Sequence, residues 1–142
     1  ASPHFKIVGL SLGDTFERVK KLLGMEYEKV DARRISYQSA DGGNCEITFE
    51  DNEVVCVQVG VGSAKPGKTQ RPAWVKLQPN AKWSIRYGDS KSYVESKLGK
   101  PDETFKVIST GCAYYRLQVI VSYEKEKVIA LALARNGRPP RL

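Results

Sequence analysis

The sequence predicts an α+β fold of two tandem repeats, each a short helix followed by an antiparallel sheet. First, the segment from Leu12 to Gly24 recurs as Tyr87 to Gly99, with identical residues at a constant offset of 75. Second, stretches of alternating polar and apolar residues follow both copies, which is typical of strands with one buried face. Units of roughly 60 to 65 residues are marginal alone. We therefore expect one long curved sheet with the helices on one face, and function at the junction.

Helix signals are the same in both copies. Asp14 precedes an apolar stripe, and Glu17 follows at capping-box spacing, so Asp14 is the predicted N-cap. Asp89 takes the same role in the second copy. Gly24 and Gly99 supply the permissive backbone of a C-terminal cap.

The predicted strands follow each helix. In the second copy we expect one long strand from Tyr114 to Tyr123. Asp51-Asn52 and Lys125-Glu126 are the predicted turns between strands, and residues 41–44 and 110–111 are the predicted loops that lead into the central hairpins. The expected strands cover residues 34–37, 45–49, 54–59, 105–108, 114–123 and 127–134.

Four segments describe the predicted organisation. The first α/β repeat covers residues 1–61, and the second covers 81–136. Between them lies a linker, 62–80, rich in proline, glycine and basic residues, and a basic tail follows at 137–142. The stretches 5–10 and 81–85, which precede each Gly-Asp pair, are expected to form a helical turn.

Composition excludes several classes of protein. The 142 residues are 41% hydrophobic and 27% charged, which is ordinary for a soluble globular chain. No apolar stretch approaches the ~20 residues that a membrane span needs. The chain begins at Ala1-Ser2-Pro3, which fits either a mature secreted protein or a shortened chain. A secreted, periplasmic or cell-envelope location is the expectation.

The net charge of +7 is concentrated in two segments. Residues 65–82 carry five cations and no acid, and residues 135–141 carry three more cations. Such segments can contact an anionic polymer or a membrane surface. The alternative is that they are a solvated linker and tail.

Three cysteines leave at least one thiol unpaired in a monomer. Cys45 and Cys56 flank a predicted hairpin, close enough in register for a cross-strand bridge, which would leave Cys112 free. The alternative is three reduced, partly buried thiols. With a single His in the chain, no zinc site is expected.

Nothing in the sequence predicts catalysis. His4 lies beside Pro3 at the margin of the chain, which is a poor place for a positioned base. No G-x-S-x-G, H-E-x-x-H, phosphate-loop or dinucleotide pattern occurs. We therefore expect a protein that is not an enzyme and takes no cofactor or metal.

The phrase Leu98-Gly99-Lys100-Pro101, which closes a helix opened by Gly-Asp, resembles the SmpA/OmlA-like envelope lipoproteins. Two such units in one chain are similar to the β-lactamase inhibitory protein fold family. That resemblance implies a long curved sheet that clamps a partner. In that family an Asp from a first-repeat loop and a Phe from the second repeat enter the partner. Asp41 stands in a comparable loop, whereas Phe105 lies earlier than the matching position.

The binding surface is expected on the open sheet face. If Val119 and Val121 face the helices, strand alternation buries Tyr115 and Tyr123 on the same side. The even-numbered residues of the strand then face outward, where a partner can bind. The predicted outward row is Tyr114, Arg116, Gln118 and Ile120, and the predicted partner-binding residues are Arg34, Tyr37, Asp41, Trp74, Tyr114 and Arg116.

The expected function is a noncatalytic protein-binding module, either a clamp-like inhibitor or an envelope assembly factor. Its partner is another protein, and nucleic acid is not expected. The alternative is a binder of anionic polymer or membrane surface through the basic linker and tail.

Overall fold

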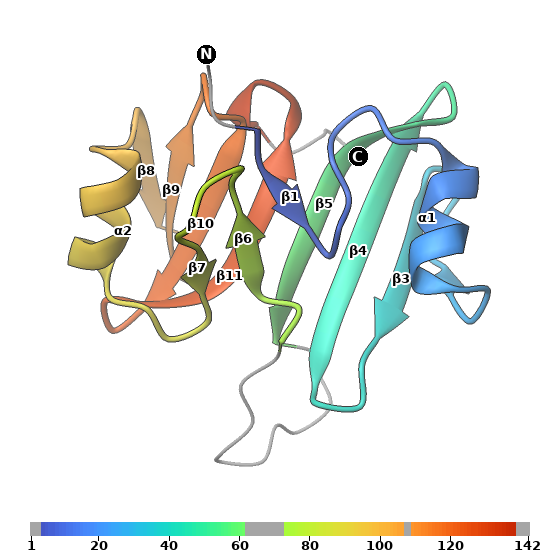
Figure 1. The fold of residues 1–142 in the computed structure, drawn as a ribbon, viewed down its shortest axis with the longest axis horizontal. Helices are drawn as coiled ribbons and strands as arrows, with labels where there is room; N and C mark the ends of the chain where they lie inside the picture. Colours follow the sequence, from blue (N-terminus) through green and yellow to red (C-terminus); the bar gives the residue numbers. More distant parts are fainter. Residues whose placement is uncertain (1–3, 62–72, 107–108, 139–142) are drawn as a thin grey trace.

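The computed structural model describes residues 4–61, 73–106 and 109–138. Its main element is one antiparallel eight-stranded sheet, ordered β2-β3-β4-β5-β11-β10-β9-β8 (Figure 1). The fold is α+β, as predicted. The strands of this sheet are β2 (Glu28–Lys29), β3 (Arg34–Gln38), β4 (Gly43–Glu50), β5 (Glu53–Val61), β8 (Glu103–Lys106), β9 (Thr110–Tyr114), β10 (Val119–Glu124) and β11 (Lys127–Ala134).

Each repeat contributes one four-stranded meander, and the two meanders join edge to edge. The junction is the antiparallel pairing of β5 with β11, from Gly60 opposite Ala130 to Cys56 opposite Ala134. At its centre Gln58 pairs with Ala132. After a one-residue slip near Met25 and Pro101 the offset between the repeats becomes 74, which makes these two residues equivalent. A local two-fold relation therefore passes between them.

Both helices cover the same face of the large sheet. α1 (Phe16–Leu23) lies over the first repeat and α2 (Lys91–Leu98) over the second. A small antiparallel sheet, β1-β6-β7, fills the space between them (Figure 1). Its strands are β1 (Lys6–Ile7), β6 (Lys76–Gln78) and β7 (Ile85–Arg86). A final 3-10 turn, η1 (Arg135–Gly137), follows β11.

The main core lies between the large sheet and this second layer. It takes the alternate residues of each strand that face the helices, together with one buried valine from each helix, Val19 and Val94. The small sheet closes the middle by turning its apolar residues inward: Ile7, Leu77 and Ile85 are fully buried.

The repeated Gly-Asp pair anchors each helix to the hairpin behind it. The N–H of Gly13 donates to the carbonyl of Val54 (2.8 Å), and the N–H of Gly88 donates to that of Val128 (2.8 Å). The predicted N-caps were wrong by one residue. The caps are Thr15 and Ser90, whose hydroxyls accept from the third residue on.

Asp14 and Asp89 instead close the loop that precedes each helix. Their carboxylates accept the backbone N–H of Ser11 (2.9 Å) and of Arg86 (2.8 Å). The short side chain of Asp reaches backward here because the backbone turns at the preceding glycine.

A buried tyrosine ties each helix end to the sheet. Tyr37 of β3 donates its hydroxyl to the carbonyl of Gly24 (2.8 Å), and Tyr114 of β9 donates to that of Gly99 (2.9 Å). Both glycines end their helices at positive φ, 94° and 83°, as predicted. Each tyrosine satisfies a carbonyl that the helix leaves unpaired.

The linker and the two helical turns that the sequence predicted differ in the structure. The expected linker 62–80 contains strand β6, and Val75 and Leu77 are buried there. The expected helical turns at 5–10 and 81–85 are not helical. Residues 6–7 and 85–86 are strands that pair with β6, Val8 and Gly9 form a tight turn between Ile7 and Leu10, and residues 81–84 are bends and irregular chain. Residues 62–72 of the expected linker lie outside the described residues.

The predicted strand 114–123 is interrupted by a turn at 115–118. The carbonyl of Gln118 accepts the N–H of Ala134 (3.0 Å), and the φ of Gln118 is 59°. No Gly or Pro marks this turn in the sequence, so the alternating pattern concealed it.

We expect Tyr37→Phe and Tyr114→Phe each to lower the free energy of unfolding by about 1 kcal/mol, because each leaves a helix-end carbonyl unpaired. The two losses should add, because the tyrosines lie at separate helices. Urea unfolding followed by fluorescence measures both. Tyr123→Phe is the control: Tyr123 is equally buried, but its hydroxyl has no hydrogen-bond partner among the residues that the structure describes. A loss in the control as large as in the other two would contradict the assignment.

Candidate interaction surface

The face of the large sheet opposite the helices, here called the open face, consists of the remaining alternate residues of each strand. Strand register aligns them in rows across both repeats. One row is Ser36, Glu46, Gln58, Ala132, Ile120 and Ala113, and the next is Gln38, Asn44, Gly60, Ala130, Ser122 and Gly111.

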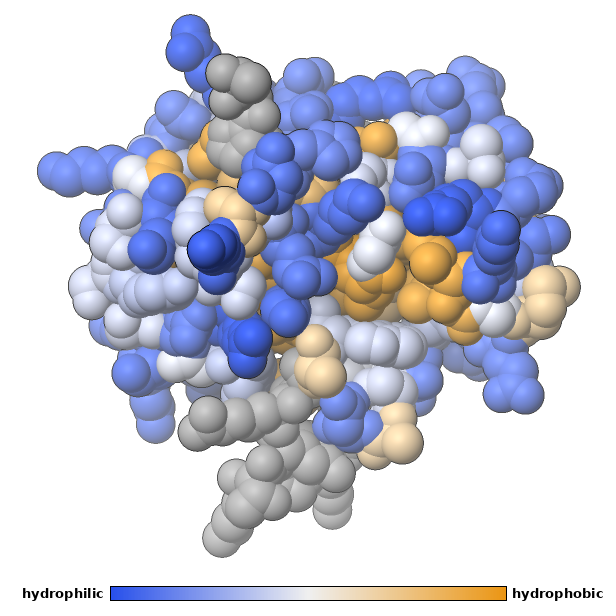
Figure 2. Space-filling view, in the orientation of Figure 1, coloured by the Kyte–Doolittle hydropathy of each residue, from blue (hydrophilic) through white to orange (hydrophobic). Residues whose placement is uncertain are grey.

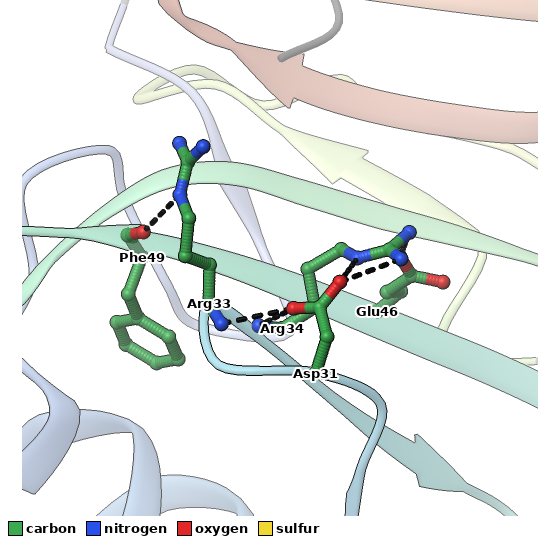
Figure 3. A network of polar contacts seen from close by, with 5 residues as sticks. All are labelled: Asp31, Arg33, Arg34, Glu46 and Phe49. Carbon is green, nitrogen blue, oxygen red and sulfur yellow. Dashed lines mark hydrogen bonds and ion pairs between the residues drawn. The ribbon is translucent and has the colours of Figure 1, made fainter. Parts of the chain in front are cut away.

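The first-repeat half of the open face is polar and held by an ion-pair network (Figure 3). The Arg34 guanidinium lies between two acids: its Nη2 is 2.7 Å from Asp31 Oδ2, and its Nη1 is 3.0 Å from Glu46 Oε1. Asp31 also accepts the backbone N–H groups of Arg33 and Arg34, both at 2.9 Å. The bond from the Arg33 N–H, and then that from the Arg34 guanidinium, lower the pKa of Asp31.

The second-repeat half is apolar and made of small residues. Ala113, Ile120, Ala132 and Ala134 form a cluster with Cys56, against which the aromatic rings of Phe105 and Tyr115 pack. The Phe105 ring covers Gly111 and leaves no room there for a Cβ. An aromatic ring over a glycine on the neighbouring strand shields the exposed backbone.

Tyr115 is fixed at the edge of this apolar half. Its N–H donates to Asp102 Oδ2 (2.8 Å), its hydroxyl donates to Glu103, and the Arg138 guanidinium lies 5.0 Å from its ring centroid. The hydrogen bond to Glu103 raises the pKa of the Tyr115 hydroxyl. Its ring is therefore held in one orientation, partly exposed.

Two cavities meet along the centre of the open face. A cavity of about 430 Å³ lies at the junction of the repeats, with Glu46, Gln58 and Gly60 on one side and Glu124 and Ala130 on the other. A smaller one of about 120 Å³ is lined by the apolar half. Both cavities include Gln58 and Ala130, so they form one continuous groove, here called the junction groove. Its residues are Asn44, Glu46, Cys56, Gln58, Val59, Gly60, Val61, Tyr87, Phe105, Ile120, Ser122, Glu124, Ile129, Ala130, Leu131 and Ala132.

The predicted partner-binding residues do not come together. Arg34 lies on the open face, but its guanidinium is already paired with Asp31 and Glu46. Arg116 is exposed in the turn between β9 and β10, beside a hollow lined by His4 and Leu117. Trp74 is half-buried and packs against the main core.

Tyr37 and Tyr114 were wrongly placed on the binding surface. Each is only 3% exposed and faces the helices. The turn at 115–118 is the reason for the second error. The prediction extended the in-and-out alternation of side chains from Val119 back through residues 118–114, but the turn interrupts that alternation. Tyr114 therefore faces inward and Tyr115 outward, the reverse of the prediction, while Tyr123 is buried as predicted.

Asp41 stabilises its own loop. Its carboxylate accepts the Ser39 hydroxyl, the N–H of Gly43 (3.3 Å) and the N–H of Ala73 (2.9 Å). The hydrogen bond from Ser39, followed by that from Ala73, lowers the pKa of Asp41. The side chain therefore connects the β3–β4 loop to the segment that leads into β6.

Of the two alternatives for the cysteines, the structure has three unbridged thiols: Cys45 and Cys56 do not form a bridge, because they lie on opposite faces of the sheet. Cys45 pairs with Val59 in the helix-side core, whereas Cys56 pairs with Thr48 on the open face. All three cysteines are free and buried. Burial raises the pKa of Cys45 to about 12 and that of Cys56 to about 11.

No metal-binding group was found within the described ranges, where no cluster of three His, Cys, Asp or Glu side chains occurs. The His4 ring contacts a hydroxyl: its Nε2 lies 3.1 Å from Ser11 Oγ. No helix in the described part of the chain is long and apolar enough to cross a membrane.

Sequence reasoning missed most of the junction groove. Gln58, Ser122 and Ala130 drew no attention, because small or neutral residues in strands carry no functional signal alone. Phe105 was considered only as an aromatic residue that lies earlier than the resemblance requires. Phe105 with Gly111 offered a weak signal, an aromatic residue and a glycine on adjacent strands.

Comparison with known proteins gives a likeness of fold. No protein-family model matches the chain, and a search of curated proteins found no match. Among solved structures, the chain is similar to a cysteine-rich secretory protein from Staphylococcus aureus, with a TM-score of 0.52 and 12% identity. The match covers 92% of this chain and 46% of that one, so the chain spans about half the length of its structural neighbour. At this identity the likeness shows that the arrangement of elements recurs.

We expect a thiol reagent to react slowly with the native protein at neutral pH and to detect all 3 cysteines after denaturation, because each thiol is buried and none is bridged. Detection of a single thiol in denaturant without reductant would contradict this assignment.

Stability should also fall as the pH rises above 9. The unfolded thiol ionises near its ordinary pKa of 9.0, whereas burial keeps folded Cys45 protonated until about 12. The raised folded pKa therefore favours folding below pH 9, and the contribution is lost as pH approaches the folded value. Urea unfolding at intervals through this window tests the effect, and a Cys45→Val variant should show a smaller fall.

Proposed function

We propose that the chain is a noncatalytic, secreted or cell-envelope protein-binding module that holds its partner in the junction groove. The observation that carries the proposal is the division of the open face. One half is polar and fixed by ion pairs, the other is apolar and built from small side chains, and the groove runs between them.

The groove has the chemistry of a protein interface. Phe105 and Tyr115 are partly exposed aromatic side chains beside an apolar floor, and polar side chains form the opposite rim. Small residues at Gly60, Ala130 and Ala132 let a partner side chain approach the backbone. Both ends of the groove are set on strands, so a partner meets a largely preformed surface.

The charge of the groove favours a particular partner group. Glu46 and Glu124 line the larger cavity, although the whole chain carries a net charge of +7. Glu46 is paired with Arg34, whereas Glu124 makes no ion pair with the described residues. We therefore infer that the partner places a basic side chain in the larger cavity and an apolar one in the smaller.

The resemblance to clamp-like inhibitors supports the same surface but not the same contacts. In this chain Asp41 is engaged by its own loop. Phe105 lies on the open face. We infer that it takes the role of the second-repeat Phe that enters the partner in the inhibitor family.

Ser122→Arg tests the proposal. Ser122 lines the smaller cavity, so an arginine there should obstruct the groove. Ser92→Arg is the matched control, with the same substitution at an exposed position of α2 on the other side of the sheet. Tagged proteins are used to capture partners from envelope and secreted fractions at low salt and at about 0.5 M salt.

We expect the wild type and the control to retain one stoichiometric partner protein in high salt. Ser122→Arg should bind the same partner at least tenfold more weakly, which corresponds to about 1.4 kcal/mol. Equal capture by all three proteins would exclude the groove.

A further inference from the structure

The outer face of the small sheet presents only basic and neutral polar side chains. Its strands β1, β6 and β7 bury Ile7, Leu77 and Ile85 on the inner face. The alternate residues point away from the large sheet, and they are Lys6, Lys76, Gln78 and Arg86. We call this set the basic face. Figure 2 shows hydrophilic surface over the small sheet, with apolar colour beside it toward α1.

The basic face brings like charges together. Lys76 lies directly opposite Arg86 in the β6–β7 register, and Lys6 lies opposite Gln78. Directly opposed residues have Cβ atoms about 5 Å apart, where like charges are destabilising. Lys82 follows in the β6–β7 connection, and the Lys97 ammonium lies 5.9 Å from the Trp83 ring centroid there. These cations extend the positive surface toward α2.

No acidic side chain neutralises the basic face within the described residues. The ion pairs found there involve Arg33, Arg34 and Arg135, which are elsewhere. The Asp89 carboxylate accepts the backbone N–H of Arg86, and the Arg86 side chain instead donates to Ser84. Residues 1–3, 62–72, 107–108 and 139–142 contain no Asp or Glu, so they supply no acidic side chain either.

We propose that the basic face binds a linear polyanion whose repeating charges are phosphates. Such a chain would place successive charges between Lys76, Arg86 and Lys6 and relieve their repulsion. Release of counterions from the polymer would add to the affinity.

The residue types distinguish this partner from others. Lysine is depleted at protein–protein interfaces and is a common point-charge ligand of phosphate. No aromatic side chain stands on the basic face, so it offers no platform for stacking bases of single-stranded nucleic acid. It also carries no apolar side chain that would enter a lipid interface.

This inference is independent of the junction groove, because none of the four basic-face residues lines either of its cavities. It also differs from the sequence expectation, which placed anion binding in the segments 65–82 and 135–141. Of the basic face, Lys76 and Gln78 belong to those segments, whereas Lys6 and Arg86 do not.

Binding of long-chain inorganic polyphosphate to the full chain, measured by calorimetry at several salt concentrations, tests the proposal. The variant is Lys6→Gln/Lys76→Gln/Arg86→Gln. The control is Lys29→Gln/Lys106→Gln/Lys127→Gln, which removes the same charge from exposed positions of the large sheet. Vesicles containing anionic lipid and a poly-glutamate peptide serve as competing ligands.

We expect the wild type and the control to bind polyphosphate in preference to both other ligands. The basic-face variant should bind at least tenfold more weakly, and its log–log salt slope should be shallower by about 2, since each phosphate contact on a single chain contributes about 0.7. Equal weakening in both triple variants would overturn the proposal, because net charge alone would explain binding. Equal or tighter binding of vesicles or poly-glutamate would overturn the choice of phosphate polymer. Ser122→Arg should leave polyphosphate binding unchanged, which separates this result from the test of the groove.

Discussion

The pairing of β5 with β11 is the interaction on which the rest of the structure depends. It aligns Val57 with Leu133 and Val59 with Leu131, so the buried rows of one repeat continue into the other. Either meander alone would leave an unpaired edge and half of a small core, which is a marginal unit. Gly60 permits the close approach, since a Cβ there would lie 3.2 Å from the Cβ of Ala130.

The same register determines both faces of the sheet. A shift of one residue would exchange the helix-side and open-face sets on every paired strand. The register shift between Thr48 and Phe49 leaves an extra residue, Val55, in β5, and the shift between Ser122 and Tyr123 leaves the equivalent residue, Ile129, in β11. These two bulges redirect the side chains at equivalent positions of the repeats. The small sheet then spans the two repeats, because it combines β1 from the first with β7 from the second.

The sequence was sufficient for the features that depend on local pattern. The repeat offset located both helices and their glycine ends, and alternation located β11 at its observed bounds. Features that depend on distant contacts were not accessible. β6 is too short to show a period, and the turn before Val119 is maintained by Gln118 and Ala134 rather than by turn residues. The groove was missed for the same reason, because its residues become neighbours only through register.

Comparison of the repeats with each other separates scaffold from surface. Positions that hold the fold carry the same chemistry in both copies: Gly13 and Gly88, Asp14 and Asp89, and Tyr37 and Tyr114 make equivalent hydrogen bonds. Equivalent positions on the open face differ, with Glu46 replaced by Ile120 and Gln58 by Ala132. The helix-side positions must fill one shared core, whereas the open face is free of that packing requirement. The two-fold scaffold therefore carries an asymmetric groove, polar on one side and apolar on the other, and only such a groove can fix the direction of a bound chain.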